Sequence, residues 1–196
     1  MKKILVINGG QTFAHSGGTY NKTITETTLA FFATKPEFEV QVTHIDQGYE
    51  VAEEITKWSW ADVVIYHTPI WWFQLPNNFK KYLDEVLTAG HGIIYANDGR
   101  SSQNPAINYG TGGLLKNTQY MVTTSWNAPA TAFTMEGEFF DQRSVDDGVL
   151  FGFHKMNAFN GMKSLPSFHF HDVEKNAAVT QDMARYTAHL ETLFGC

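Results

Sequence analysis

The chain has almost no cysteine and fewer basic than acidic residues. Cys196, the last of 196 residues, is its only cysteine. A lone cysteine forms no internal disulfide, and a thiol at the chain end is a poor candidate for a buried nucleophile. The 14 Lys and Arg against 20 Asp and Glu leave a net charge of −6. Because phosphate neutralisation requires an excess of basic side chains, this balance argues against a general nucleic-acid binder.

Long apolar runs are also missing. After Lys2 and Lys3 the apolar run covers only residues 4–7, which is too short for the apolar region of a signal peptide. No segment approaches the ~20 apolar residues that a membrane span requires. We therefore expect a cytoplasmic protein without a membrane span. With 43% hydrophobic and 17% charged residues, the chain is expected to fold as a single domain over residues 1–196.

Several motifs that would reveal a catalytic mechanism are absent as well. The loop of residues 9–19 carries neither the GxGxxG pattern of dinucleotide-binding folds nor the GxxxxGK[ST] pattern of nucleotide-binding loops. The chain has no HExxH zinc motif and no GxSxG nucleophile elbow, and its carboxylates are scattered. We predict no metal site. If the chain is an enzyme, we expect a cofactor to carry its chemistry.

Patterns typical of strands alternate along the chain with patterns typical of helices. Strands are expected at residues 4–8, 40–45, 63–66, 119–124 and 167–171, and helices at 20–35, 51–57, 79–87, 149–160 and 180–194. This alternation predicts an α/β fold with a doubly wound five-stranded parallel sheet and helices on both faces. The run 63–66 is apolar on both faces, as in a strand buried inside such a sheet.

Tryptophans gather just past two of these strands. Pro69, Trp71 and Trp72 follow the strand at 63–66, and Trp126 follows the strand at 119–124. In open α/β sheets, ligands bind at the carboxyl ends of the strands. The adjacent indoles alone leave open whether these side chains wall a planar ligand or pack a helix on the sheet. Their recurrence after a second strand favours a ligand site.

The first loop suits an anion. Ser16, Thr19 and Thr23 supply hydroxyls, Asn21 supplies an amide, and neighbouring glycines let backbone N–H groups approach closely. Followed by a helix N-terminus, such a loop can bind a phosphate without a cation. An ordinary glycine-rich connector is the alternative interpretation.

The segment between residues 87 and 119 has only a weak periodic pattern. Glycine clusters at 90–92 and 110–113 interrupt it. Loops of this length are usually functional or disordered. The apolar residues Ile93, Ile94 and Tyr95 indicate that the segment is ordered. We expect it to lie over the mouth of the site.

A planar ligand with a phosphate tail, held by aromatic loops and a hydroxyl-rich loop, fits a flavin nucleotide. Matching stretches then extend through most of the chain: FAHS (13–16), WADVV (60–64), WW (71–72), GHG (90–92), YGTGGL (109–114), TSWNAP (124–129) and FHK (153–155). On these stretches the chain resembles the modulator of drug activity B group of NADPH:quinone reductases, in the flavodoxin-like quinone reductase family that includes DT-diaphorase. Ser125 and Phe73 depart from the family pattern, in which Thr and Met occur.

The resemblance implies a homodimer that binds FAD in preference to FMN. NADPH would reduce the flavin by hydride transfer, and the flavin would pass two electrons to a quinone in a ping-pong cycle. By position, the resemblance implies cofactor contacts from Ser16, Gly17, Gly18, Thr19, Tyr20, Asn21, Lys22, Thr23, Ile70, Trp71, Trp72, Phe73, Ser125, Trp126, Asn127 and Ala128. The segment 16–23 would hold the pyrophosphate and ribityl region, and the other two would flank the ring.

Tyr109 is the catalytic residue that the resemblance implies, and it counts among the cofactor contacts too. It would lie against the ring where the substrate stacks, and its hydroxyl would stabilise developing charge. A loop tyrosine that packs on a glycine turn is the alternative interpretation. His91 and Arg100 would reach the site or a cofactor phosphate, or else serve the structure alone.

Three other functions are weighed against this one. An FMN-dependent azo- or nitroreductase would share the fold, and composition does not reveal whether an adenine pocket exists. A flavodoxin-type electron carrier would dock on redox partners through a strongly acidic face, whereas the net charge of −6 is spread along this chain. A flavin-free regulatory protein is disfavoured by the intact hydroxyl-rich loop and the tryptophan pair. The physiological quinone and the preference for NADPH over NADH are not determined by these residues.

Overall fold

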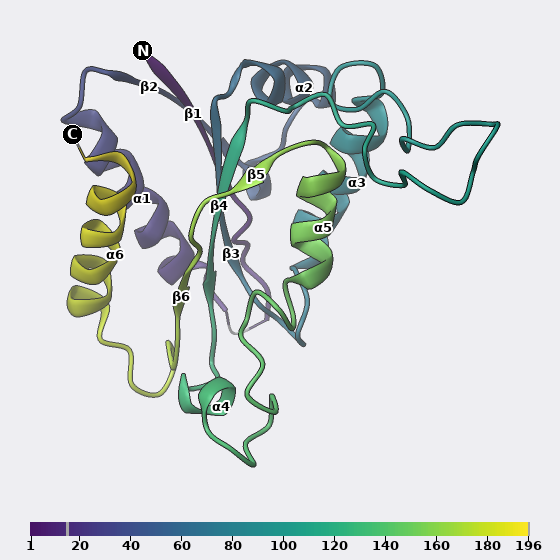
Figure 1. Ribbon diagram of the computed structural model, residues 1–196. Coiled ribbons are helices and arrows are strands. Elements are labelled where there is room, and N and C mark those ends of the chain that lie inside the picture. The colour runs from purple at the N-terminus through teal and green to yellow at the C-terminus, as the bar shows by residue number, and fades with distance from the viewer. Residues whose placement is uncertain (15, 196) are drawn as a thin grey trace.

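Six strands form the central sheet, in the order β2–β1–β3–β4–β5, with β6 also paired to β4. The computed structural model describes residues 1–14 and 16–195 (Figure 1). His15, part of the matched FAHS stretch, and Cys196 lie outside the described residues. The expectation that Cys196 is no buried nucleophile therefore stays a prediction.

The elements alternate as the periodicity predicts. The strands are β1 (Lys2–Asn8), β2 (Phe38–His44), β3 (Val63–Pro69), β4 (Gln119–Ser125), β5 (Lys163–Ser164) and β6 (Phe168–Phe170). The helices are α1 (Thr19–Ala33), α2 (Val51–Trp60), α3 (Asn77–Ala89), α4 (Thr131–Thr134), α5 (Phe151–Phe159) and α6 (Val179–Phe194), with a short 3₁₀ helix η1 (Ile45–Gln47). All pairings between these strands are parallel.

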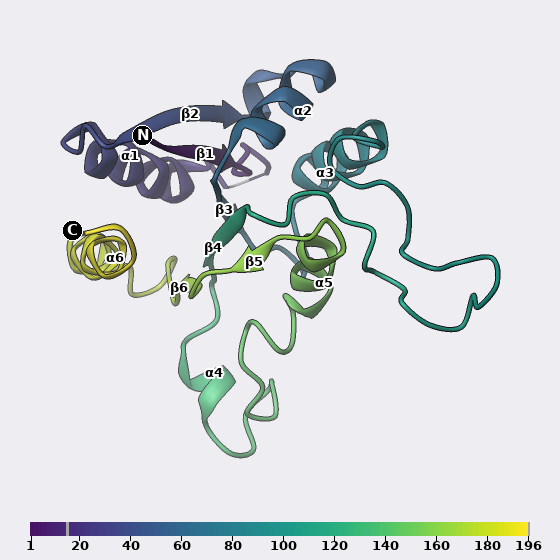
Figure 2. The same ribbon diagram turned by 45° about the horizontal axis from the view of Figure 1, so that its top comes forward.

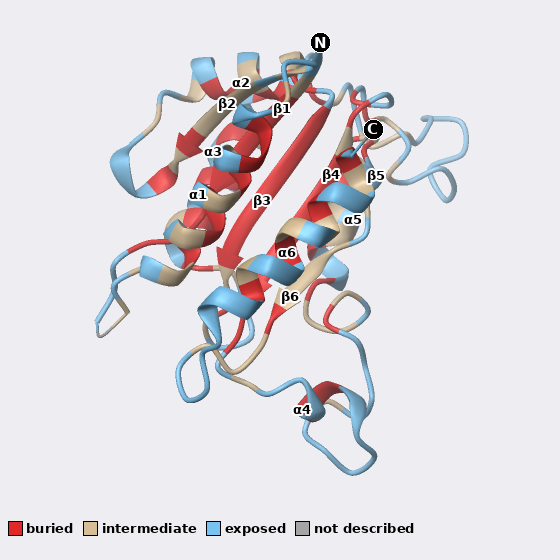
Figure 3. Ribbon diagram, turned by 90° about the vertical axis from the view of Figure 1, so that its left-hand side faces the viewer, coloured by how far each residue is buried: buried red, intermediate tan, exposed pale blue. Residues whose placement is uncertain are grey.

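Helices cover both faces of the sheet, and the central strands β1, β3 and β4 between them are mostly buried. Alternate residues of β1 point to opposite faces, as a strand requires. Ile4 and Val6 belong to the core that α1 and α6 close, whereas Leu5 and Ile7 belong to the core that α2, α3 and α5 close. Figure 2 shows the two groups of helices on either side of the sheet, and Figure 3 shows the buried strands between them. The predicted doubly wound parallel sheet is confirmed.

The edge strand differs from the prediction, because it is divided in two. The sequence pattern predicts one strand at 167–171. The structure has β6 there and adds β5, and β5 pairs Lys163 with Gln119 whereas β6 pairs Phe168 with Thr123. The pairing offset grows by one residue between them, around Pro166, which has no N–H to donate to a neighbouring strand. A two-residue exposed strand such as β5 has too short a pattern to be recognised in the sequence.

The segment 90–118 protrudes beside α3 and α5, on the side of the molecule away from α6 (Figure 1). Its backbone is tied to itself, because Ala96 N donates to Gly112 O at 2.9 Å and Leu114 N donates to Ile94 O at 2.9 Å. Among the described residues, no helix combines the length and the apolar character that crossing a membrane requires.

Candidate functional site

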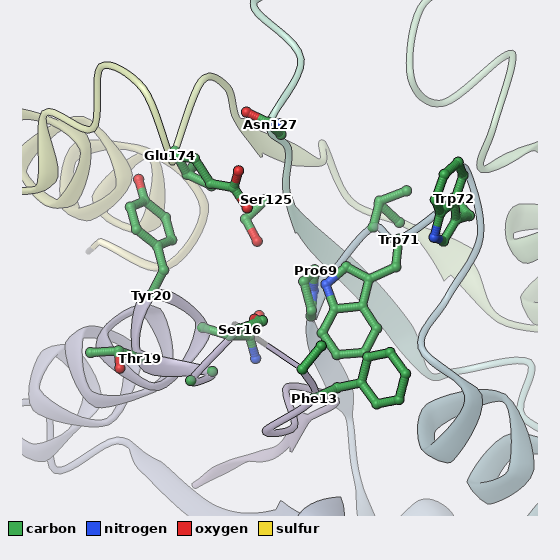
Figure 4. Close-up of a pocket in the computed structure, with 16 residues that line it drawn as sticks. Phe13, Ser16, Thr19, Tyr20, Pro69, Trp71, Trp72, Ser125, Asn127 and Glu174 are labelled. Carbon is green, nitrogen blue, oxygen red and sulfur yellow. The ribbon is translucent and has the colours of Figure 1, made fainter.

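A cleft of about 700 Å³ opens at the carboxyl ends of β1, β3 and β4. This volume lies within the range of small-molecule and cofactor sites. The cleft is lined by Phe13, Ala14, Ser16, Gly17, Gly18, Thr19, Tyr20, Asn21, Pro69, Ile70, Trp71, Trp72, Ser125, Asn127, Val173 and Glu174. Figure 4 shows these side chains arranged around an open centre, with the β1–α1 loop opposite the loop after β4. Four segments that are distant in sequence thus meet at one edge of the sheet.

The β1–α1 loop presents the start of a helix to the cleft. Gly18 has φ 68°, and a Cβ there would lie 3.2 Å from the carbonyl oxygen of Gln11, so the position favours glycine. Helix α1 begins at Thr19, and no side chain caps it. The first N–H groups of a helix have no partner within it and carry the positive end of the helix dipole. This wall therefore suits an anion, as the sequence predicts.

A buried amide lies at the base of this wall. The Nδ2 of Asn21 donates to the side-chain oxygen of Asn8 and, at 3.2 Å, to the carbonyl oxygen of His67. These two acceptors determine the orientation of the amide. Its Oδ1 has no hydrogen-bond partner among the residues that the structure describes, although the residue is only 2% exposed. An unpaired buried acceptor is costly, so this oxygen suits a hydroxyl or N–H donor of a bound ligand.

The imidazole of His67 is part of the floor rather than of the reactive surface. Its Nε2 lies 3.0 Å from Thr28 Oγ1 and its Nδ1 lies 2.8 Å from Thr123 Oγ1. Complete burial lowers the pKa of His67 to about 3. The ring is therefore neutral at physiological pH, and its backbone carbonyl holds both Asn21 and the N–H of Gly9.

The second wall is a tight turn built from bulky residues. Trp71 and Gln74 exchange two backbone hydrogen bonds of 3.0 Å each. Between them, Trp72 and Phe73 have φ values of 47° and 62°. Non-glycine side chains in this left-handed region cost roughly 1–2 kcal/mol each. Such strain persists where the surrounding structure enforces it, and it clusters at functional sites.

The two adjacent indoles of this turn have different surroundings. The ring of Trp71 packs against Phe13, with ring centroids 5.4 Å apart and planes tilted by 32°. Trp72 is 93% exposed, although it lies at the rim of the cleft. Figure 4 shows its indole apart from the Phe13–Trp71 pair. One indole thus forms the wall, and the other is free to contact a ligand or a second chain.

The third wall is the loop that follows β4. Ser125 and Asn127 line the cleft, but Trp126 between them is buried. Its indole N–H donates to Thr124 Oγ1 at 2.6 Å, and its ring packs edge-on against Phe133 at 5.0 Å between centroids. Trp126 therefore supports the loop from behind. Its expected place beside the ligand is not found in the structure.

The structure brings together most of the expected cofactor contacts, namely Ser16, Gly17, Gly18, Thr19, Tyr20, Asn21, Ile70, Trp71, Trp72, Ser125 and Asn127. Lys22, Thr23, Phe73, Trp126 and Ala128 do not line the cleft. Lys22 pairs with Glu26 on the outer side of α1 at 3.8 Å, and Thr23 Oγ1 donates to the helix backbone at 3.1 Å. Phe73 turns outward and stacks on Phe139, with centroids 5.5 Å apart.

Tyr109 does not line the cleft of its own chain. It is 70% exposed, and its ring contacts Phe159 and the guanidinium of Arg100. Arg100 pairs with Asp98 at 2.6 Å, and the Nε2 of His91 lies 2.8 Å from the carbonyl oxygen of Ala96. All these contacts stay near the protruding segment. The prediction that residues 87–119 cover the mouth is wrong within one chain, because the segment extends from the side of α3 and α5.

Five lining residues were not assigned from the sequence, namely Phe13, Ala14, Pro69, Val173 and Glu174. Val173 and Glu174 lie in the loop after β6, which ends at Phe170, so the rule that points to loops after parallel strands would have found them. The backbone holds them there, because Val173 N donates to Trp126 O at 3.0 Å.

A carboxylate–histidine cluster joins the segment between α4 and α5 to the sheet. Asp146 Oδ1 lies 2.8 Å from His154 Nε2, and its Oδ2 lies 3.4 Å from His169 Nε2. Burial acts to raise the pKa of the Asp146 carboxyl, but hydrogen bonds from His154 and His169 outweigh it and hold that pKa well below its usual range. Within the described residues, no group of three or more His, Cys, Asp or Glu has the arrangement of a metal site.

The family described as having the flavodoxin-like fold matches residues 2–193. This match covers almost the whole chain and agrees with the strand order and the position of the cleft. The chain belongs to the flavodoxin-like family. Two of its relatives share about half of its residues. A protein of Schizosaccharomyces pombe is 50% identical over 197 residues, which cover 98% of this chain and 97% of the relative.

The other relative carries a functional name. The NADPH:quinone oxidoreductase MdaB of Haemophilus influenzae is 48% identical over 193 residues, which cover 98% of this chain and 99% of that protein. The resemblance to the modulator of drug activity B group is thus confirmed. At this coverage, the similarity includes the cleft and the loops around it.

Solved structures show the same fold at lower identity. A candidate quinone reductase of Klebsiella pneumoniae superposes with a TM-score of 0.79 at 22% identity, covering 99% of this chain and 85% of that one. The general stress protein 14 of Treponema denticola, solved in complex with FMN, has a TM-score of 0.67 at 22% identity, covering 98% of this flavodoxin-like chain and 99% of the other.

Proposed function

We propose that this chain is an FAD-dependent NADPH:quinone oxidoreductase that reduces quinones by two electrons in a ping-pong cycle. The observation that carries the proposal is the cleft itself, which joins an uncapped helix N-terminus at Thr19 to an aromatic wall at Trp71. The name of the 48% identical Haemophilus influenzae relative supports the same activity.

The residues of the cleft fit a flavin nucleotide. The N–H groups at the start of α1 and the hydroxyls of Ser16 and Thr19 suit phosphates. The unpaired Oδ1 of Asn21 suits a hydroxyl of the sugar-like chain. Trp71 and Asn127 would flank the planar ring. When bound, FAD supplies an acceptor for the hydride of NADPH and a two-electron donor for the quinone.

The chain's own contribution is to bind and orient. The rim of the cleft is open beside the exposed indole of Trp72. A donor must approach within ~3–3.5 Å of its acceptor for hydride transfer. One open slot next to the ring, used by NADPH and then by the quinone, accounts for a ping-pong order. The hydroxyl of Tyr20 is no proton donor here, because burial and its hydrogen bond to Asp182 raise its pKa far above 10.

We infer that the enzyme is a homodimer in which Tyr109 acts on the site of the second copy. Tyr109 is exposed on a protruding segment and does not line its own cleft. Trp72, which lines the cleft, and Phe139, which stacks on Phe73 of the same turn, are also exposed. A second copy that covers these aromatics would complete the site, and the tyrosine hydroxyl would then stabilise charge that develops on the ring or the quinone.

Mixed dimers test this arrangement. A Tyr109→Phe chain and a Gly18→Val chain would each be nearly inactive as homodimers. In a mixed dimer, one site combines the intact cradle of the first chain with the intact tyrosine of the second. We expect quinone reductase activity to return in that mixture. If activity does not return although mixed dimers form, Tyr109 does not act across subunits.

The identity of the flavin is tested by the visible absorption spectrum of the purified protein and by chromatography of the released cofactor. Flavin bands that bleach with NADPH and return with a quinone, together with released FAD, support the proposal. Released FMN would favour an FMN-dependent azo- or nitroreductase, the alternative suggested by the FMN complex of the Treponema denticola protein. Flavin bleaching without turnover of small quinones would favour a flavodoxin-type electron carrier. A protein that stays colourless with both flavins would contradict the proposed function.

A further inference from the structure

Among the described residues that line the cleft, one carries a charge. They include no Lys and no Arg, and Glu174 is their only carboxylate. Figure 4 shows the Glu174 side chain directed toward Ser125, across from the phosphate-binding loop at Ser16 and Thr19. Carboxylates of exposed glutamates are ionised at neutral pH. From the described residues of the lining, an anion in the cleft therefore faces one negative charge and no Lys or Arg side chain.

Neighbouring cations do not neutralise Glu174. Within the described residues, its carboxylate takes part in no ion pair and no hydrogen bond. Arg185, on α6, is bound to Asp182 at 2.6 Å, and the hydroxyl of Tyr20 donates to the same carboxylate at 2.6 Å. Lys22 pairs with Glu26 outside the cleft. The charge of Glu174 is thus available to act on whatever enters.

The two flavin nucleotides differ in the charge that they would place there. FMN ends in a phosphate monoester, which carries nearly two negative charges at pH 7 because its second pKa is about 6. In FAD, each of the two bridged phosphates carries one charge. FAD also continues into an adenosine, whose sugar hydroxyls are hydrogen-bond donors. Glu174 would repel the monoester dianion and accept hydrogen bonds from these hydroxyls.

We propose that Glu174 determines the preference for FAD over FMN. The inference rests on the proposed flavin-binding function and adds to it a residue and a cause. Helix α1 and the hydroxyl loop supply the attraction for phosphate, which both flavins share. Glu174 supplies the discrimination. Its carboxylate repels FMN, whose charge is more concentrated, and accepts hydrogen bonds from the adenosine hydroxyls of FAD.

The test compares flavin affinities of the cofactor-free protein by isothermal titration. A Glu174→Gln variant keeps the size of the side chain and removes its charge. We expect it to bind FMN roughly three- to tenfold more tightly than the parent does, the size of effect that one partly exposed charge has on a phosphate. FAD affinity should stay equal or fall, so that the FAD-to-FMN affinity ratio decreases.

A Glu53→Gln variant serves as the control, because Glu53 is an exposed carboxylate on α2 outside the cleft. It removes the same charge and should leave the affinity ratio unchanged. Added salt should narrow the difference between the parent and the Glu174→Gln protein for FMN, since an electrostatic effect at an exposed site is screened.

Each result decides a different point. If the parent binds FAD but Glu174→Gln leaves the ratio unchanged, the assignment of Glu174 is overturned while the proposed function stands. If Glu53→Gln lowers the ratio as much, the effect belongs to net charge and the assignment is overturned too. If the parent binds neither flavin, both the inference and the proposed function are wrong.

Discussion

The β1–α1 loop and the β3–α3 turn occupy equivalent positions, each after a buried parallel strand, yet they are built in opposite ways. The first loop reaches positive φ values at Gly18, where glycine costs nothing, and at Ala14, whose side chain is a single methyl group, and it exposes backbone N–H groups. The second reaches positive φ values at Trp72 and Phe73, which bear large side chains. The comparison indicates that the polar wall works through its backbone. The aromatic wall works through side chains that the fold holds in a strained turn.

Both walls depend on the structure around the buried imidazole of His67, and acid should lower the stability that this group contributes. The pKa of His67 is about 3 in the folded chain and near 6.5 in an unfolded one, so its contribution to stability is complete above pH 6.5. As the pH falls from 6.5 toward 3, only the unfolded chain gains the proton. We expect the free energy of unfolding to fall by about 1.4 kcal/mol per pH unit in that range from this group.

Urea denaturation at several pH values measures that slope. A His67→Gln variant is the control, because its amide retains a hydrogen-bonding group near Thr28 and Thr123 but does not titrate. Its stability should depend less steeply on pH. Equal slopes in the two proteins would mean that His67 is not the group responsible.

The polar wall is tested by adding one methyl group at two neighbouring glycines. Gly18→Ala places a Cβ at a positive φ and near Gln11, so the loop should relax and the cradle should be lost. We expect flavin affinity to fall roughly 5- to 30-fold, which corresponds to the cost of a left-handed alanine. Gly17→Ala is the matched control, because its Cβ would meet only Thr19 Oγ1, at 3.5 Å. Similar affinities of both variants would show that the backbone geometry of Gly18 does not matter.

At the aromatic wall, a substitution should relieve backbone strain rather than add it. Trp72→Asn replaces a residue that is 93% exposed by one that tolerates the left-handed conformation. We expect the protein to become more stable by about 0.5–1 kcal/mol, since strain is relieved and little packing is lost. Thermal unfolding measures this gain. Activity with quinones should fall at the same time, because the exposed indole is lost from the rim.

A loss of stability on Trp72→Asn would mean that the indole packs against another surface in solution, for instance that of a second copy. Thermal unfolding measured below the concentration at which the chain associates shows whether a second copy is responsible, because the loss of stability should then disappear. A gain of stability with unchanged activity would remove Trp72 from the proposed site.

The carboxyl edge of the sheet was predictable because it depends on short-range patterns. Residues 4–7 and 63–66 are apolar on both faces, and such runs are typical of strands that helices cover on both sides. Once the strands are known, the loops that follow them must meet. Ser16, Trp71 and Asn127 do line one cleft, as their positions after parallel strands suggest.

Trp126 shows where such reasoning ends. Its position in the sequence is equivalent to that of Trp71, but its indole turns away and packs on Phe133 and Phe140. Those partners belong to the segment after β4, whose four-residue helix α4 has no recognisable pattern. The orientation of a side chain in a loop depends on what packs against it, and although Phe133 and Phe140 follow Trp126 closely in the sequence, no local pattern indicates that they pack on its indole.

The sequence by itself therefore determined the alternation of strands and helices, the parallel sheet, and the loops that form the cleft, because hydrophobic period and turn residues act over a few neighbours. Only the tertiary structure decided that Trp126 supports the cleft from behind, that Tyr109 lies outside it, and that Glu174 is the one charged residue among the described residues of its lining. These outcomes depend on how segments pack against one another in three dimensions, because packing and burial determine side-chain orientations that the local sequence pattern does not.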